Sequence, residues 1–140
     1  MTMYPLTFYV KSLPPNVGGS TNGPIIRILE KYRHDEGIYR HELMHVMQWA
    51  VWSLLCLPTA YVLYQLGLFD WLGLAILPCT FHQLLYKLIP SYRFWAEVEA
   101  YKVQALYYQD DRRPLFAEFI AGCYDLPHST KQALDALNRK

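Results

Sequence analysis

A long, almost uncharged stretch in the middle of the chain constrains its fold more than any other feature. Between Val46 and Tyr86 the only formally charged residue is Asp70, whereas ordinary charged sequence lies on both sides. So many apolar side chains have to leave water, by packing against protein or by entering lipid. As a helix, residues 49–69 would measure about 31 Å, which matches the hydrocarbon core of a bilayer.

The stretch has the pattern of an apolar helical hairpin. Asp70 and the nearby Gly67 and Gly73 predict its tip, and a second apolar run follows over residues 71–89. Tryptophans and tyrosines near the ends are typical of a membrane–water interface. Prolines and scattered polar residues favour the alternative, a hairpin packed in a protein core or against an apolar protein partner. The expected contact surface is residues 46–89 in either case.

Basic residues flank the hairpin on both sides, with Lys31, Arg33 and Arg40 before it and Lys87 and Arg93 after it. A hairpin that spans a membrane would therefore keep both chain ends on the cytoplasmic side. The alternative location is a larger assembly, such as a virion.

Turn residues and apolar periodicity predict a mainly α chain, an α+β fold with a small N-terminal β element. Residues 5–12 and 24–32 alternate as strands do, and the turn-rich residues 14–23 between them are expected to form a loop. A helix should start near Asp35 or Gly37 and continue until Pro58 bends or ends it. A second helical stretch is expected after Thr59, and further helices are expected at about 71–89, with an interruption near Pro78, and at about 90–109, 115–123 and 129–138.

Composition limits the possible functions. A chain of 140 residues fits one domain, and a net charge of +1 without a basic cluster excludes a nucleic-acid partner. The cysteines Cys56, Cys79 and Cys123 are odd in number and have no CxxC spacing. Neither a disulfide framework nor a cysteine-only zinc site is expected.

The segment HELMH, residues 41–45, carries the clearest chemical signal. His41 and His45 are four residues apart, so on a helix both imidazoles can reach one metal ion. Glu42 is rotated by about 100° from His41 on such a helix and would lie beside the metal. There it could act as a general base towards a water molecule activated by the metal.

A catalytic zinc site normally needs a third protein ligand. Glu97 and Glu99, in the segment AEVEAY, are the two choices. Glu97 is favoured because Tyr101, one turn later on the same face, could support a ligand, and because the small Ala100 would let this helix approach the HELMH helix. Gln48, one turn after His45, would orient a ligand or bind substrate, or else simply pack against the next element.

The two motifs together resemble the gluzincin class of metallopeptidases, in which HExxH pairs with a glutamate on a later helix. HELMHVMQW, an apolar segment and AEVEAY are also similar to small membrane-associated peptidases of bacteria and their phages. The resemblance covers residues 36–109 and implies a Zn²⁺ ion held by His41, His45 and Glu97, with Glu42 as general base and a peptide or protein as substrate.

The resemblance also implies one zincin-like domain over residues 1–140. Its parts would be a β element at 1–34, then the active helix, apolar hairpin and third-ligand helix at 36–109, and the C-terminal helices at 114–140. Within the β element, Ile25–Leu29 is a candidate edge strand for extended substrate, or else a strand of the core.

Two points stay open at the level of the sequence. His82 is expected to be a buried, hydrogen-bonded histidine rather than a ligand. A hydrolase also needs a donor for the developing oxyanion, and the sequence does not rank the candidates, which are Tyr39, His34, Arg93, Tyr124 and His128.

The alternative function is a non-catalytic protein of a membrane or virion, either stabilised by zinc or without any zinc. An open coordination position facing a cleft would favour catalysis, and a fourth protein ligand would favour a structural role.

Overall fold

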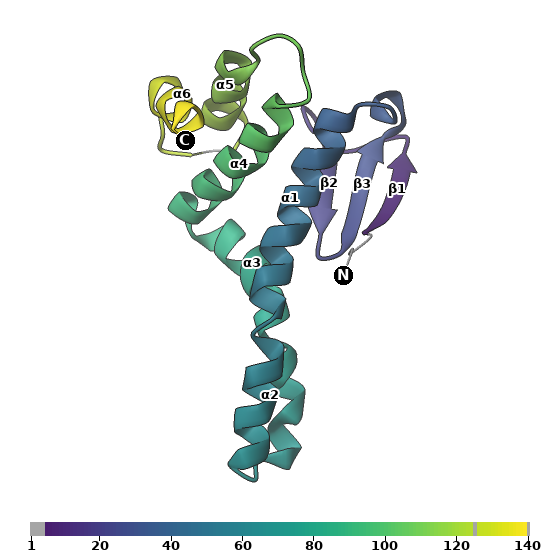
Figure 1. The fold of residues 1–140 in the computed structure, drawn as a ribbon, viewed down its shortest axis with the longest axis vertical. Coiled ribbons are helices and arrows are strands. Elements are labelled where there is room, and N and C mark those ends of the chain that lie inside the picture. Colours follow the sequence, from purple (N-terminus) through teal and green to yellow (C-terminus); the bar gives the residue numbers. More distant parts are fainter. Residues whose placement is uncertain (1–4, 125, 140) are drawn as a thin grey trace.

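A small sheet at the N-terminus is followed by helices, so the prediction of a mainly α, α+β fold is confirmed (Figure 1). The computed structural model describes residues 5–124 and 126–139. The elements in chain order are β1 (Leu6–Val10), β2 (Gly19–Asn22), β3 (Ile25–Leu29), the 3₁₀ helix η1 (Glu30–Tyr32), α1 (Glu36–Ser53), α2 (Cys56–Gln65), the 3₁₀ helix η2 (Phe69–Ile76), α3 (Pro78–Leu88), α4 (Pro90–Ala105), α5 (Arg113–Cys123) and α6 (Thr130–Asn138).

Strand β3 lies in the centre of the sheet, where β1 pairs with it in parallel and β2 pairs with it antiparallel. Ile26 and Ile28 of β3 point to the same face and are buried against Val46 of α1. Because both sides of β3 are already paired, the prediction that Ile25–Leu29 offers a free edge to substrate is wrong. Among the described residues, β1 and β2 form the edges of this sheet.

Strand β2 lies in the segment 14–23 that the sequence predicted to be a loop, and that prediction is wrong for residues 19–22. Only Gly23 and Pro24 separate β2 from β3, and Gly23 has a φ of 60°, which suits a tight turn. The sequence of β2 is GSTN and contains no large apolar side chain. Strand β2 therefore forms through backbone pairing with β3, and no hydrophobic pattern in the sequence indicates it.

Helix α1 begins where the sequence predicted. Asp35 caps it by accepting a hydrogen bond from the backbone N–H of Ile38 at 3.1 Å. The helix breaks at Leu54 and Leu55, just before Pro58, which has no N–H to bond to the carbonyl of residue 54. The Pro58 prediction therefore locates the break to within a few residues.

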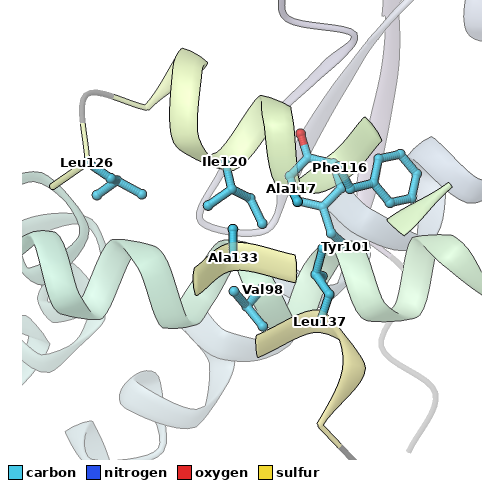
Figure 2. Close-up of a cluster of buried hydrophobic side chains, with 8 residues drawn as sticks. All are labelled: Val98, Tyr101, Phe116, Ala117, Ile120, Leu126, Ala133 and Leu137. Carbon is cyan, nitrogen blue, oxygen red and sulfur yellow. The ribbon is translucent and has the colours of Figure 1, made fainter. Parts of the chain in front are cut away.

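Helix α4 packs closely along α1, on the side of α1 away from the sheet (Figure 1). Ala96 and Ala100 of α4 are completely buried, as expected for small residues that let two helices approach. Helices α5 and α6 pack against α4 in turn. Figure 2 shows the core that joins these three helices, which consists of Val98, Tyr101, Phe116, Ala117, Ile120, Leu126, Ala133 and Leu137.

Helix α2 and the 3₁₀ helix η2 form a hairpin that projects away from the other elements (Figure 1). Its turn contains Gly67, whose φ is 69°. Helix α2, described in full, buries none of its side chains, and η2 buries only Ala75. The exposed surface is strongly apolar; Leu57 on α2, for example, is 75% exposed. The hairpin is therefore not buried in the core of its own chain.

Helices α1 and α2 together form a helical rod, Glu36–Gln65, that is 30 residues long when counted through the break at Leu54 and Leu55. By length and composition it is the one helix within residues 5–124 and 126–139 that could cross a membrane.

Candidate metal centre

His41, His45 and Glu97 lie together between α1 and α4 and are 6%, 8% and 1% exposed, respectively. The Nε2 atoms of the two histidines are 3.2 Å apart. Nε2 of His41 lies 3.5 Å from Oε2 of Glu97, and Nε2 of His45 lies 3.3 Å from Oε1. The structure thus brings together the three residues that the two motifs indicated.

These separations leave the three side chains within reach of one metal ion. Zinc binds histidine nitrogen and carboxylate oxygen at about 2.0–2.1 Å with tetrahedral angles, which places neighbouring ligand atoms about 3.3–3.4 Å apart. The two nitrogens, 3.2 Å apart, are close to that value, and each nitrogen lies 3.3–3.5 Å from a different oxygen of Glu97. One ligand atom from each of the three residues lies within 4.8 Å of the other two. A buried group of two imidazoles and one carboxylate with this spacing is compatible with a metal ion.

The unpaired atoms of the site also fit a metal. Among the described residues, Oε2 of Glu97 is a buried side-chain oxygen without a hydrogen-bond donor. Leaving a buried carboxylate oxygen unsatisfied is costly, and a cation in contact with it would remove that cost. The other oxygen, Oε1, accepts a hydrogen bond from the Tyr86 hydroxyl.

The surroundings keep Glu97 negatively charged. Burial alone would raise the pKa of its carboxyl group, but the charge of His45, followed by the close approach of both imidazoles, outweighs burial, and the pKa lies well below its usual range. A carboxyl group has to be deprotonated to bind a metal, so the site holds Glu97 in the form that a metal needs.

Gln48 connects His45 to helix α4. Its Oε1 lies 2.9 Å from Nδ1 of His45, and its Nε2 donates to the carbonyl oxygen of Ala96 at 3.1 Å. An amide oxygen can only accept, so Nδ1 of His45 carries a proton. Burial would lower the pKa of His45, but the charge of Glu97 outweighs burial and raises it to about 9, so Nε2 has to release its proton to bind a metal. Gln48 thus both orients a histidine and packs against the neighbouring helix.

Replacing Gln48 by leucine is expected to weaken metal binding about 10–100-fold, because partners of this kind hold a ligand in its tautomer and orientation. Competition with a chromophoric chelator measures the affinity. Gln104→Leu is the matched control, since Gln104 is an equally buried amide on α4 that hydrogen-bonds to Tyr108. Equal affinities of the two variants would contradict the orienting role.

Tyr101 lies close to the site without a hydrogen bond to any of the three residues. Its ring contacts His41 edge-on, with the centroids 4.4 Å apart, and its hydroxyl lies 3.1 Å from that of Tyr124. Tyr86, on α3, is the tyrosine that bonds directly to Glu97. Burial and then the charge of Glu97 raise the pKa of Tyr86, so this hydroxyl stays protonated and acts as a donor.

Glu42 lies beside the three residues and faces strand β2. Its Oε2 accepts a hydrogen bond from the Thr21 hydroxyl at 2.6 Å, and the same hydroxyl reaches the backbone carbonyl oxygen of Glu42 at 3.1 Å. A side chain at position 19 would not fit, because a Cβ there would lie 2.6 Å from Oε1 of Glu42. Gly19 thus permits the edge of β2 to approach this carboxylate.

The other glutamate of AEVEAY, Glu99, lies away from the group formed by the two histidines and Glu97. Its carboxylate pairs with Lys102 at 3.0 Å and is partly exposed. Of the two choices for a third ligand, the structure therefore places Glu97 with the histidines.

His82 lies near the site but outside the group of possible ligands. Tyr92 accepts a hydrogen bond from the Trp52 indole at 2.9 Å, so its own proton can go to Nδ1 of His82, also at 2.9 Å. Burial, and next the charge of His45, lower the pKa of His82 to about 4. His82 is thus a neutral, buried and hydrogen-bonded histidine, as expected from the sequence.

The candidates for an oxyanion donor differ in their surroundings. The Arg93 guanidinium donates to the backbone carbonyl oxygens of Tyr86, Lys87 and Tyr124, so it ties α3 to α5. His128 stacks on Phe94, Tyr39 packs beside the buried residues of the sheet, and His34 is exposed. The Tyr124 hydroxyl is linked to the site through Tyr101.

Sequence reasoning missed Tyr86, Thr21 and Gly19. Tyr86 ends the uncharged stretch, where it resembles an interface aromatic, and the other two lie in the strand that was taken for a loop. Comparisons of the chain with protein-family profiles, with curated proteins and with solved structures find no match.

Proposed function

We propose that this chain is a zinc-dependent peptidase of the gluzincin type. The observation that carries the proposal is the buried group of two histidine nitrogens, 3.2 Å apart, and one carboxylate, with an oxygen within 3.5 Å of each nitrogen. The HExxH spacing and the glutamate on a later helix support the same assignment.

In this proposal His41, His45 and Glu97 hold the ion, and Gln48 and Tyr86 fix the orientation of His45 and Glu97. Zinc, when bound, supplies a Lewis acid that polarises a peptide carbonyl and makes water more acidic. Glu42 accepts the proton of the attacking water and passes it to the leaving amine. Thr21 holds one oxygen of Glu42 in place for this transfer.

The free edge of β2 is a better candidate than β3 for the place where a peptide substrate binds. An extended peptide can add to a sheet edge through backbone hydrogen bonds, and β2 is the edge that adjoins Glu42. A peptide bound there would run past the proposed general base.

Metal content and hydrolysis together test the proposal. The purified full chain should contain about one zinc ion per molecule and should cleave fluorescein-labelled casein or a quenched-peptide library. A chelator should abolish the cleavage, and added zinc should restore it. Absence of any bound metal would refute the site, whereas bound zinc without cleavage of any peptide would favour a structural role.

A zinc-stabilised structural or interaction protein is the second candidate. The low exposure of His41, His45 and Glu97 favours it, because a substrate has to reach the metal. X-ray absorption of the zinc-loaded protein separates the two candidates, since a water ligand indicates an open position and a fourth protein ligand indicates a closed one.

We also propose that the α2–η2 hairpin enters lipid. Many of its large apolar side chains are exposed, and lipid would cover them without a specific partner surface. An apolar protein partner is the alternative occupant.

Flotation with phosphatidylcholine–phosphatidylglycerol vesicles tests the lipid proposal. Leu57→Asp combined with Val62→Asp should reduce membrane partitioning by at least about 100-fold, since a charged residue costs about 2.5–3.5 kcal/mol within a bilayer. Leu106→Asp is the matched control, because Leu106 is 80% exposed but follows α4, outside the hairpin. Equal flotation of both variants would contradict insertion through the hairpin.

A further inference from the structure

Two cysteines that are far apart in the sequence meet at the base of the hairpin. Cys56 is the first residue of α2, and Cys79 is the second residue of α3. Their sulfur atoms lie 3.0 Å apart, and both side chains are half-buried. The third cysteine, Cys123, is exposed at the end of α5.

Contacts between α1 and α3 hold these two cysteines close to each other. The Trp49 indole, on α1, donates a hydrogen bond to the backbone carbonyl oxygen of Cys79 at 2.8 Å. One turn later, Trp52 packs edge-on against Phe81 of α3, with the centroids 5.9 Å apart. The two tryptophans hold the start of α3 beside the junction of α1 and α2, and Cys56 is the first residue after that junction.

We propose that Cys56 and Cys79 form a reversible disulfide that clamps the base of the hairpin. The oxidant would be a small disulfide. The thiolate of one cysteine attacks it, forms a mixed disulfide and releases one small thiol. The second cysteine then attacks the mixed disulfide, which forms the Cys56–Cys79 bond and releases the second small thiol. Each cysteine loses one proton, and the two electrons reduce the small disulfide.

The bond would have a defined structural effect. It would close a covalent loop around the whole of the hairpin and join the α1–α2 rod to α3. Helix α3 carries Tyr86, which bonds to Glu97, so the same bond would also restrain a helix that borders the candidate metal centre. The pairing itself does not depend on bound metal or on hydrolysis.

The test treats the full chain, in detergent micelles, with oxidised glutathione and then alkylates it under denaturing conditions. Mass spectrometry should show three alkylated cysteines before oxidation and one afterwards. Peptide mapping should identify Cys56–Cys79 as the linked pair and Cys123 as the remaining thiol. Dithiothreitol should restore three alkylated cysteines.

Serine variants provide matched controls. Cys123→Ser should still lose two reactive thiols on oxidation, whereas Cys56→Ser and Cys79→Ser should form no link within the chain. Amide hydrogen exchange in residues 56–79 should slow on oxidation of the wild type and stay unchanged in Cys79→Ser. The proposal is overturned if the wild type keeps three reactive thiols, or if it forms mixed disulfides with glutathione and no link within the chain. A link that involves Cys123 would overturn it as well.

Discussion

Glu97→Gln is expected to lose its metal almost completely. The amide is neutral, so the substitution removes the one negative charge of the proposed ligand set and with it most of the attraction for a divalent cation. The loss of affinity should exceed the roughly 10–100-fold cost of removing a residue that only orients a ligand. Inductively coupled plasma mass spectrometry of the dialysed protein measures the zinc content directly.

Glu99→Gln is the control for this experiment. Glu99 lies on the same helix, two residues further on, and its carboxylate pairs with Lys102 rather than with the histidines. This variant should keep the zinc content of the wild type. If both variants retain metal equally, Glu97 is not a ligand, and if Glu99→Gln alone loses metal, the third ligand is Glu99. Circular dichroism of both proteins checks that α4 remains helical.

Glu42→Gln is expected to retain zinc and lose hydrolysis. An amide of the same size keeps the packing against Gly19 and can still hydrogen-bond to Thr21, but it cannot accept a proton from water. General bases typically contribute about 10²–10⁴-fold to a rate, so kcat/KM should fall by that factor. The assay is cleavage of labelled casein by protein with a measured zinc content.

Glu36→Gln is the matched control on the same helix. Glu36 lies in the first turn of α1, where it is exposed and pairs with Arg40. Its replacement should leave both zinc content and rate close to those of the wild type. Wild-type rates in Glu42→Gln would sink the proposed mechanism, and loss of zinc from that variant would show that Glu42 belongs to the ligand set instead.

Much of the helical part of the fold could be predicted from the sequence because its boundaries depend on local chemistry. Asp35 caps α1, prolines open α3 and α4, and Ser129 caps α6 through a reciprocal hydrogen-bond pair with Gln132. These signals involve residues within one turn of each other. Because they do not require long-range packing, they can be recognised in the sequence itself.

The features that could not be predicted from the sequence depend on contacts between distant segments. Strand β2 forms because β3 offers it a partner, and its own residues favour turns. The bond from Tyr86 to Glu97 and the meeting of Cys56 with Cys79 require α3 to return alongside α1. No spacing rule along the chain indicates that return, whereas the two histidines and Glu97 could be inferred because HExxH and a later glutamate follow a known pattern.

The hairpin also has a consequence for the order of events during folding. Helix α1 carries two of the three proposed metal ligands and α4 carries the third, and the projecting hairpin separates them along the chain. Residues 46–96 lie between these ligands, so their meeting is a long-range step of folding, and closure of the hairpin shortens the loop that this step has to close. If lipid is what allows the hairpin to close, chain made without membranes should take up metal slowly, and adding vesicles should accelerate uptake.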